Sequence, residues 1–392
     1  MLAKFFYYQQ RLRRKMSRKL RVLNTITLSK NALRYNYRYF KKLHKEAKIC
    51  PVLKSNAYGH GLIEIAKMLD PLDPPYFVVD SFYEAFELQK AGVKTPSLII
   101  GYTHPKNYKY MKFKDVAVTM MDKETVIALG KLRRKIKVHL KVDTGMHRQG
   151  VPFDDVEEIL RLIKTYKNLE LEGICTHLAD ADNGNKNNFT QEQVKKFKKV
   201  LKIAEKLDLK PKWKHISATA GAGKVFTKEF NMVRLGLGIY GESSLDTKDK
   251  HFKKHHFEKL KPVMTFQSTI IDIKDLEKGD CVSYGCTFIA PKKMKIGIVP
   301  AGYYEGIDRR LSDKGYLYFK NKPCKILGRV CMNLTVVDLS NVKSPKKWDP
   351  IEVVGNDRSK KNCIRWMADT SKTIPYVLWI NIAPTIRRII KA

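Results

Sequence analysis

No hydrophobic run in this sequence approaches the roughly 20 residues that a membrane-spanning helix needs. The first residues, MLAKFFYYQQRLRRKMSRKLR, hold only a short aromatic cluster and lack the apolar core of a secretory signal peptide. The seven cysteines are odd in number, scattered and without a CxxC pair, which is typical of reduced thiols. These absences predict a cytoplasmic protein with no membrane partner.

Acidic residues are scarce beside basic ones. The 76 Lys and Arg against 39 Asp and Glu give a net charge of +37, and no acid precedes Glu46. Such an excess can favour nucleic acid or anionic lipid. The basic residues are, however, spread along the chain at positions expected on solvated helix faces, so a lysine-rich compositional bias is preferred and nucleic-acid binding is disfavoured. Residues 1–22 are interpreted as a flexible basic extension.

Residues 23–258 alternate short β-rich runs with stretches of helical periodicity, such as Asp154–Tyr166 and Thr190–Leu207. The eight expected strands are Ile49–Lys54, Tyr76–Ser81, Ser97–Tyr102, Val116–Met121, Lys137–Asp143, Leu171–Leu178, His215–Ala218 and Met232–Tyr240. Eight strands alternating with helices over about 200 residues predict an α/β fold of the (β/α)8 barrel type.

After Gly241 the pattern changes. Residues 242–261 are polar and charged and are interpreted as a linker. From Pro262 onward the β-like runs are short and broken by glycine, which predicts a mainly antiparallel β domain over residues 259–392. The expected strands are Met264–Ile273, Asp280–Tyr284, Lys295–Pro300, Tyr316–Phe319, Cys324–Leu327, Leu334–Leu339 and Ile351–Val354.

Active sites of (β/α)8 barrels lie at the C-terminal ends of the strands. Residues of interest at those ends are Lys54, Arg148, His177, Thr219, Arg234 and Gly236. They share one rim, so one ligand could contact them all. Thr219 and the amides after it offer an anion site at an expected helix start. An ordinary helix N-cap is the alternative role for Thr219.

Lys54 stands in the string VLKSNAYGHG, residues 52–61, between an apolar run and a glycine-punctuated turn. An amine at the mouth of a buried strand can be desolvated, which lowers its pKa and makes it nucleophilic. A lone lysine after a strand is more often a solvated surface residue. The whole string, however, closely resembles the segment of alanine racemases that carries pyridoxal phosphate (PLP) on its lysine.

The resemblance extends over nearly all the chain beyond residue 22. Seven further segments are similar in sequence and spacing to alanine racemase motifs: KVDTGMHRQG (141–150), THLADAD (176–182), VRLGLGIYG (233–241), VSYG (282–285), GYYEGIDR (302–309), GRVCMN (328–333) and IPY (374–376). Several independent motifs with consistent spacing are far more specific than any one of them.

The resemblance implies two catalytic bases, Lys54 and Tyr284, one for each face of the substrate. In relatives the tyrosine comes from the other subunit, which implies a homodimer with shared sites. A tyrosine is a poor base near pH 7 unless positive neighbours lower its pKa, and His177 and Arg234 resemble residues that do this. Taken alone, Tyr284 would more often be a packing residue.

The resemblance also implies PLP as the cofactor. The residues it implies to bind PLP are Lys54, Tyr58, Arg148, His177, Thr219, Arg234, Gly236, Leu237 and Tyr376. Arg234 would face the ring nitrogen, and because arginine cannot accept a proton, the ring would stay neutral, which disfavours transamination. Arg148 and Met332 would bind the amino-acid substrate.

Other positions carry weaker expectations. Lys141 matches a lysine that is carbamylated in many relatives, although an inward-facing, salt-bridged barrel lysine is the alternative. Asn333 stands where the family usually has aspartate, which puts substrate specificity in doubt more than reaction type. No metal is expected, because the cluster His251, His255 and His256 has no carboxylate or cysteine set to complete a site.

The favoured function is interconversion of L-alanine and D-alanine, which supplies D-alanine for peptidoglycan. A racemase of broader or different amino-acid specificity is an alternative on the same scaffold. A PLP decarboxylase is disfavoured, because Arg234 replaces the expected acidic ring partner and Tyr284 supplies a second base. A non-catalytic PLP-binding or nucleic-acid-binding protein is the alternative from another class.

Overall fold

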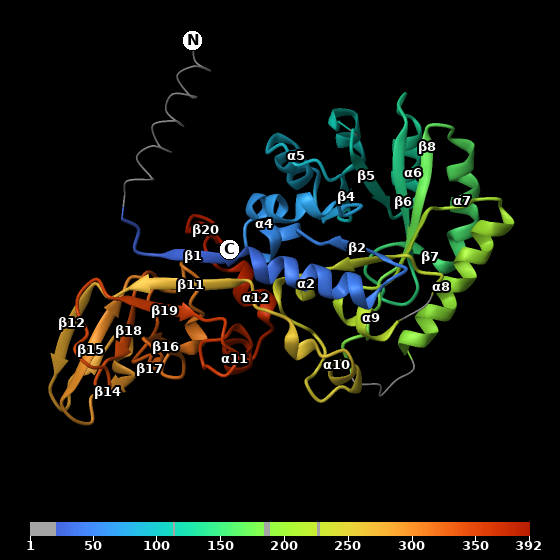
Figure 1. Cartoon of the computed structure of the whole chain (residues 1–392). Coiled ribbons are helices and arrows are strands. Elements are labelled where there is room, and N and C mark those ends of the chain that lie inside the picture. The colour runs from blue at the N-terminus through green and yellow to red at the C-terminus, as the bar shows by residue number, and fades with distance from the viewer. Residues whose placement is uncertain (1–20, 113, 184–188, 226–227) are drawn as a thin grey trace, which may run out of the picture. The chain divides into compact units, whose positions relative to one another are not determined.

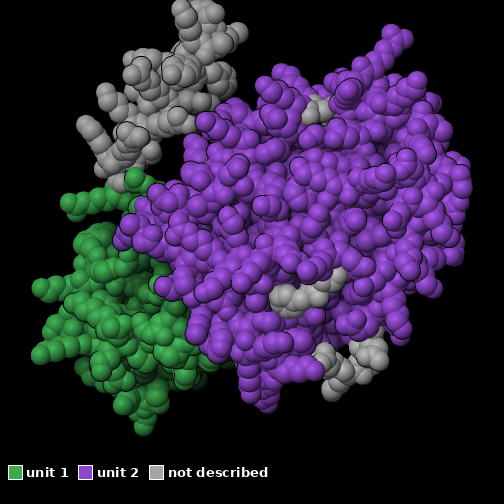
Figure 2. Space-filling model, turned by 45° about the vertical axis from the view of Figure 1, so that its right-hand side comes forward, with its two compact units in different colours: residues 1–27, 265–389 green, residues 28–264, 390–392 purple. Residues whose placement is uncertain are grey.

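The computed structural model describes residues 21–112, 114–183, 189–225 and 228–392 (Figure 1). The predicted basic extension, residues 1–22, lies almost wholly outside these ranges. The chain divides into two compact units, Leu28–Met264 with Ile390–Ala392, and Thr265–Ile389 with the described residues before Leu28 (Figure 2). Among the described helices, none is long and apolar enough to cross a membrane.

The larger unit is a barrel of eight parallel strands, which follow the order expected from the sequence. They are β2 (Lys48–Pro51), β3 (Phe77–Val79), β4 (Ser97–Ile99), β5 (Val116–Met120), β6 (Ile136–Asp143), β8 (Leu169–Cys175), β9 (Trp213–His215) and β10 (Met232–Leu235). The seventh shares only His215 with its expected range, and Leu237–Tyr240, expected as the end of the eighth, forms a 3-10 turn. Parallel ladders join β3, β4, β5, β6, β8 and β9 in that order, and β10 pairs with β2. A bridge between Val52 and Val78 and a bond from Arg234 N–H to the Ser217 carbonyl, 3.0 Å, close the ring.

The helices of this unit follow the strands in alternation. They are α2 (Lys30–Leu43), α3 (Lys54–Tyr58), α4 (Leu62–Leu69), α5 (Phe82–Lys90), α6 (Lys123–Gly130), α7 (Val156–Thr165), α8 (Phe189–Lys206), α9 (Thr219–Lys224) and α10 (Lys250–Lys254). In α7 the residues Val156, Ile159, Leu160 and Ile163 form one buried stripe, as the periodicity predicts. Figure 1 shows α7 and α8 on the outer side of β6 and β8. The (β/α)8 fold class is confirmed.

The segment expected to be a linker, residues 242–261, is instead folded onto the barrel unit. It contains α10 and a 3-10 turn, Phe257–Lys259. Phe252 and Phe257 are buried and meet edge to face, with ring centroids 6.1 Å apart. The expectation of a linker is therefore wrong. Because the segment contains many lysines, its composition does not reveal the two buried aromatic side chains.

The smaller unit is mainly antiparallel β structure, as predicted. One sheet has the order β17 (Lys322–Lys325), β16 (Tyr316–Phe319), β19 (Pro350–Val354), β11 (Met264–Thr269), β1 (Thr25–Ser29) and β20 (Arg387–Lys391). A second has the order β12 (Asp272–Leu276), β15 (Met294–Val299) and β18 (Thr335–Asp338), and β13 (Cys281–Val282) pairs with β14 (Phe288–Ile289). Two helices, α11 (Ile364–Thr370) and α12 (Pro375–Ile380), are not among the sequence expectations.

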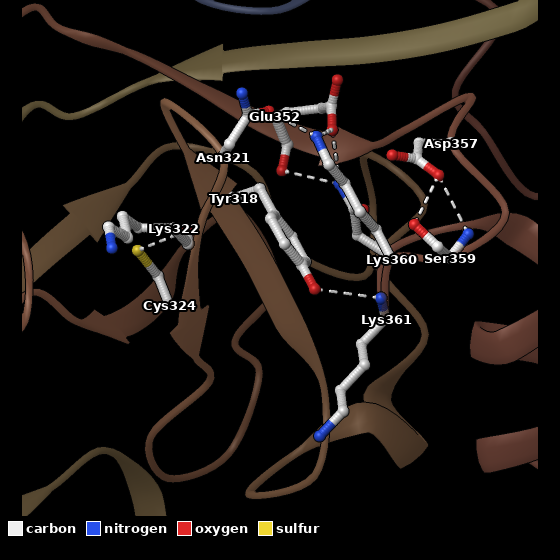
Figure 3. Close-up of polar contacts among 10 residues, drawn as sticks. Tyr318, Asn321, Lys322, Cys324, Glu352, Asp357, Ser359, Lys360 and Lys361 are labelled. Atoms are coloured by element: carbon white, nitrogen blue, oxygen red, sulfur yellow. Dashed lines mark hydrogen bonds and ion pairs between the residues drawn. The ribbon is translucent and has the colours of Figure 1, made fainter.

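The turn that leads into α11 is tied to the sheet by side chains (Figure 3). The Tyr318 hydroxyl on β16 accepts from Lys361 N–H at 3.1 Å, and Lys360 Nζ donates to Asn321 Oδ1 at 2.7 Å. Asp357 accepts from the backbone of Ser359 at 2.9 Å and shapes the turn itself. These bonds orient the start of α11 and thereby the polypeptide that continues into α12.

Asn36 is a fully buried amide that connects α2 to the end of the barrel unit. Its Nδ2 donates to the carbonyls of Ile239, 3.0 Å, and Lys261, 2.8 Å, and its Oδ1 accepts from Lys261 N–H at 2.9 Å. We expect Asn36→Ala to lower the free energy of unfolding by about 2–4 kcal/mol, because three bonds are lost and buried backbone groups are left unsatisfied. Denaturant unfolding measures the change.

The matched control is the exposed Asn107→Ala, which should change the unfolding free energy by less than about 0.5 kcal/mol. Equal stability of the two variants would show that water or relaxation replaces the Asn36 bonds.

Candidate active site

Lys54 begins a turn of left-handed helix at the C-terminal end of the first barrel strand. The four residues that follow it, Ser55, Asn56, Ala57 and Tyr58, have φ of 55°, 55°, 53° and 51°. None is glycine, and left-handed helix costs an L-residue about 1–2 kcal/mol. A strained segment of this kind persists only where the surrounding structure holds it, and such segments concentrate at functional sites.

Hydrogen bonds from both sides hold the left-handed turn. The Ala57 N–H donates to the Leu53 carbonyl at 2.7 Å, and Asn56 Oδ1 accepts from the N–H of Leu62 at 2.8 Å. From α5, Glu84 accepts from Asn56 N–H at 3.3 Å. The turn thus fixes where the half-buried Lys54 leaves the barrel wall.

Arg234 on β10 is a buried guanidinium bonded to the ends of neighbouring strands. Its Nη2 donates to the carbonyls of Thr176, 2.8 Å, and Ile216, 3.2 Å, and its Nη1 donates to the His215 carbonyl at 3.2 Å. Nη1 also bonds His215 Nδ1, and Nη2 bonds His177 Nδ1 at 3.2 Å. No carboxylate contacts Arg234 within the described ranges, and its Nε has no hydrogen-bond acceptor there. The guanidinium therefore keeps one donor for a ligand.

His177, just beyond β8, is held as a neutral ring. Burial, and then the positive charges of Arg234, Arg148 and Lys141, lowers the pKa of His177 to about 3. Because Arg234 can only donate, His177 Nδ1 must accept, and the ring proton resides on Nε2. His177 can therefore donate a hydrogen bond near neutral pH, while Arg234 supplies the positive charge.

The loop after β6 presents Arg148. Asp143 Oδ1 accepts from the N–H groups of Gly145, 2.8 Å, Met146, 2.9 Å, and His147, 3.1 Å, and so pins the loop's start. Arg148 then lies exposed at its outer part. The loop shape follows from one carboxylate that caps three successive amides.

Lys141, also on β6, lies in a cationic environment. Its Nζ donates to Gln149 Oε1 at 3.1 Å. Burial, and then the charges of Arg234 and Arg148, lowers the pKa of Lys141. The structure places no carboxylate against this amine within the described residues, so the salt-bridged alternative is not supported.

Backbone and hydroxyl donors gather between β10 and α9. Thr219 is not the N-cap of α9, which is Ala218. Its Oγ1 instead accepts from Gly238 N–H at 3.1 Å, so its own proton can point to a ligand. The buried N–H groups of Gly236 and Leu237 have no acceptor in the described part of the chain. A Cβ on Gly236 would lie 2.7 Å from the Tyr58 hydroxyl, which shows how closely that hydroxyl approaches.

In the smaller unit, Tyr284 lies on a tight, exposed turn. Its side chain is 70% exposed. Ser283 braces the turn by donating from Oγ to the Arg329 carbonyl at 2.6 Å. A disulfide joins Cys281 to Cys286 across it, with Cα atoms 5.0 Å apart, which corrects the expectation that all cysteines are reduced. The positive φ of Ser283, 65°, Gly285, 72°, and Cys286, 44°, folds the chain back so that these two cysteines meet.

The loop that carries Met332 packs tightly on the backbone of Gly302, where an added Cβ would lie 2.2 Å from the Cys331 carbonyl. Met332 accepts through its carbonyl from Tyr304 N–H at 2.9 Å, whereas its own N–H has no acceptor within the described ranges. It borders a hollow of about 450 Å³, lined also by Tyr303, Tyr304, Gly306, Asp308, Arg309, Leu378 and Asn381.

The family models agree with this division of the chain. The model of the alanine racemase N-terminal domain matches residues 28–244, and that of the C-terminal domain matches residues 263–390. The chain belongs to the alanine racemase family. The alanine racemase of Borreliella burgdorferi is 36% identical over 367 residues, which cover 91% of this chain and 94% of that protein.

Solved alanine racemases have the same fold. The structure from Clostridium difficile 630 gives a TM-score of 0.87 at 29% identity, covering 95% of this chain and 96% of that one. The structure from Bacillus anthracis, solved with bound L-Ala-P, gives 0.85 at 26% identity, covering 95% and 96%. The predicted family membership is confirmed.

The barrel unit brings together most of the candidate residues of the alanine racemase site. Lys54, Lys141, Arg148, His177 and Arg234 are close enough that their charges act on one another. Tyr284, Met332 and Tyr376, at the second position of α12, belong to the smaller unit. Sequence reasoning missed the buried residues behind this rim, among them Gln193 of α8, whose Nε2 donates to the His177 carbonyl at 3.0 Å. The sequence signal that could have found them is a polar residue type within an expected strand or helix.

Asn333 donates from Nδ2 to Glu305 Oε1 at 2.9 Å, and Glu305 Oε2 accepts from Gly302 N–H at 2.8 Å. In Asn333→Asp, the new carboxylate would lie beside the Glu305 carboxylate, and the hydrogen bond from Asn333 would be lost. We expect the variant to lose about 1–2 kcal/mol of stability at low ionic strength. The loss should become smaller in 1 M salt, because salt screens the repulsion between partly exposed charges. Thermal unfolding at both salt concentrations measures it.

Asn321→Asp is the matched control, because Asn321 faces the ammonium of Lys360 rather than a carboxylate. It should show no loss of stability at low ionic strength. A destabilisation of Asn333→Asp that is equal at both salt concentrations would contradict the electrostatic account.

Proposed function

We propose that this member of the alanine racemase family uses PLP to interconvert L-alanine and D-alanine, with Lys54 and Tyr284 as the two bases. The proposal rests mainly on hydrogen-bond donors of the barrel rim that have no acceptor in the described part of the chain. These donors are Arg234 Nε and the backbone N–H groups of Gly236 and Leu237. We further propose that the enzyme acts in the cytoplasm as a homodimer and supplies D-alanine for peptidoglycan. Relatives of at least 30% identity that bear the name alanine racemase support the substrate.

The donors of the barrel unit fit PLP. The hydroxyls of Thr219 and Tyr58 and the amides of Gly236 and Leu237 form an anion cradle of the kind that holds a phosphate. The unused Nε of Arg234 fits a ring nitrogen that accepts a hydrogen bond. Arg148 supplies a cation for the phenolic oxygen or the substrate carboxylate. In the smaller unit, we assign Tyr376 to the phosphate and the Met332 amide to the substrate carboxylate.

When bound, PLP supplies the electron sink that makes the Cα proton of an amino acid acidic. Arg234 limits that sink, because a guanidinium cannot protonate the ring nitrogen. Lys54 Nζ takes or returns the Cα proton on one face. Tyr284 Oη of a second copy does so on the other, with His177 donating a hydrogen bond and Arg234 contributing positive charge that favours the phenolate. The 70% exposure of Tyr284 in a single chain supports a role toward another subunit.

We assign carbamylation to Lys141. Its lowered pKa raises the fraction of neutral amine, which can add to CO2 with loss of a proton. The product is an anion among Lys54, Arg148 and Arg234, where it would offset part of their mutual repulsion. An unmodified ammonium at this position would add to that repulsion.

Borohydride reduction of the PLP-loaded enzyme should fix the cofactor on Lys54. The reason is that Lys54 leaves the barrel wall beside the donor cradle, with its departure angle set by the left-handed turn. Peptide mass spectrometry of the reduced protein should find the added mass on the peptide that contains Lys54. Modification of another lysine, with Lys54 unmodified, would overturn the assignment. Lys67→Ala, on the neighbouring α4, serves as the control and should leave the labelling unchanged.

Tyr284→Phe should abolish one base and leave the other. We expect racemisation to fall by about 10²–10⁴, the usual contribution of a positioned acid–base group. Exchange of the Cα proton with deuterated solvent should persist for D-alanine, whose proton we assign to the Lys54 face, and nearly vanish for L-alanine. NMR measures the two exchange rates. Equal losses for both enantiomers would refute the two-base arrangement.

The shared site is tested by mixing Tyr284→Phe with Lys54→Ala subunits. If Tyr284 serves the site of the other subunit, each heterodimer holds one site with both lesions and one intact site, so activity should reappear on mixing. Absence of recovery, with subunit exchange shown by native mass spectrometry, would place both bases in one chain. Tyr110→Phe, at an exposed tyrosine outside the proposed site, controls for loss of a surface phenol.

A further inference from the structure

A path of buried polar side chains leads from Arg234 across the barrel wall to a carboxylate. Arg234 on β10 bonds His215 on β9, and His215 Nε2 lies 2.8 Å from His139 Nδ1 on β6. His139 Nε2 in turn lies 3.5 Å from Glu172 Oε2 on β8. Both histidines are fully buried, and Arg234 and Glu172 are each 6% exposed. Such a path inside a barrel wall needs a specific arrangement of protons, because unpaired buried polar groups are costly.

The strand between the two histidines makes room for this path. Gly173 on β8 is the register partner of His139, and a Cβ there would lie 2.4 Å from His139 Nδ1. The His139 ring therefore lies over a strand position that no side chain can occupy. This close approach lets His139 reach across β8 to His215.

The two ends of the path fix every proton along it. Arg234 can only donate, so His215 Nδ1 accepts and the His215 proton resides on Nε2. That proton is donated to His139 Nδ1, so the His139 proton resides on Nε2 and points to Glu172, which can only accept. A second proton on His139 would force His215 Nδ1–H against the guanidinium. Burial lowers the pKa of both histidines, in agreement with neutral rings.

Glu172 is anchored as the ionised end. Tyr76, just before β3, donates its hydroxyl to Oε2, and Lys137 Nζ donates to Oε1 at 3.1 Å. Although burial alone would raise it, the close approach of His139 and the hydrogen bonds from Tyr76 and Lys137 lower the pKa of Glu172 to about 2. The carboxylate stays charged over the range in which the enzyme would work.

We propose that Glu172 is a positioning residue for Arg234, which acts by holding His139 and His215 in the Nε2–H tautomer. This inference rests on the proposed function, in which Arg234 faces the ring nitrogen of PLP. His215 Nδ1 is then a fixed acceptor that holds Nη1 toward the barrel interior and leaves Nε toward the ligand. Without the anchor, His215 can carry its proton on Nδ1 and repel the guanidinium.

Glu172→Gln tests the anchor while keeping its shape. Lys137 can only donate, whereas the Tyr76 hydroxyl can turn to accept, so the amide oxygen should take the Oε1 position and the amide nitrogen the Oε2 position. That nitrogen donates to His139 Nε2, which moves the His139 proton to Nδ1 and the His215 proton to Nδ1. Selective ¹⁵N-histidine labelling of the apoprotein, with signals assigned by His139→Asn and His215→Asn, reads the tautomers directly. Wild type should show Nε2–H at both rings, and Glu172→Gln should show Nδ1–H.

The activity of each PLP-loaded variant should depend on which histidine tautomers it holds. We expect Glu172→Gln to lower the racemisation rate by about 10–100-fold, as for other residues that orient a contacting group, and to release more pyruvate per turnover by transamination. Glu172→Gln with Lys137→Met frees the amide to turn its oxygen to His139, and should restore both the tautomers and the rate. Glu170→Gln, an exposed glutamate on the same strand, should leave the tautomers and the rate as in wild type.

The outcomes separate the two proposals. If wild type fails to racemise alanine, the proposed function is wrong, whereas the tautomers of the apoprotein still test the proton path. If wild type racemises alanine and Glu172→Gln keeps the wild-type tautomers and rate, the inference is overturned. Should Glu172→Gln fail to fold, Nδ1–H on His215 in the wild-type apoprotein would overturn the inference, and Nε2–H on both rings together with wild-type behaviour of Glu170→Gln would support it.

Discussion

The guanidinium of Arg234 is the group on which the rest of the barrel rim depends. Burying a cation costs several kcal/mol unless its donors are satisfied. Here the acceptors are three strand-end carbonyls and two imidazole nitrogens, so the charge is solvated by the barrel without being neutralised in contact. Its positive field therefore extends over the rim. Burial is the main cause of the lowered pKa of His177 and of Lys141, and the charge of Arg234 adds to it in both.

Strain at Lys54 has a complementary role. A right-handed helix after β2 would be the default for Ser55, Asn56, Ala57 and Tyr58, since all four are L-residues with a Cβ. The left-handed turn costs several kcal/mol in sum and is held by capping bonds from Asn56 and Glu84. In return it brings the Tyr58 hydroxyl close to Gly236 while Lys54 stays at the strand end. One short turn thereby positions both the amine that we propose as a base and the hydroxyl that we propose as a phosphate ligand.

Much of the fold follows from the sequence because barrel strands are short, alternate with helices and end in polar residues. The positions of Lys54, His177, Thr219 and Arg234 on one rim follow from that alternation alone. The left-handed turn does not, because no glycine marks its positive φ. The polar path is concealed too: in β6 the alternation of Lys137, His139 and Lys141 with apolar residues is typical of a strand with one solvated face, whereas His139 is fully buried.

The sequence also could not show the Cys281–Cys286 link, since their meeting depends on three positive φ values, two of them at residues other than glycine, in a turn that composition does not specify. The same holds for the segment 242–261, whose charge outweighs the signal of two buried phenylalanines. In both places the decisive interaction joins few residues within an otherwise polar stretch. Hydrophobic patterns of period two or 3.6 reveal strands and helices, but they do not reveal irregular turns that are held by one or two residues.

The charge balance of the rim bears on the second base that we propose. Lys54, Arg148 and Arg234 are basic, and the structure places no acid in contact with Arg234 or with the Lys141 amine in the ranges it describes. A lysine as the second base would add to their repulsion, and His177 is already held as a neutral donor. A phenolate is an anion in its basic form, so the proposed arrangement would place it where cations and the His177 N–H favour that form. It would join the phosphate, the substrate carboxylate and the carbamate that we assign to Lys141. Because the Tyr284 side chain is 70% exposed in a single chain, supplying it from a second copy, as we propose, would move its phenol from water to a cationic site.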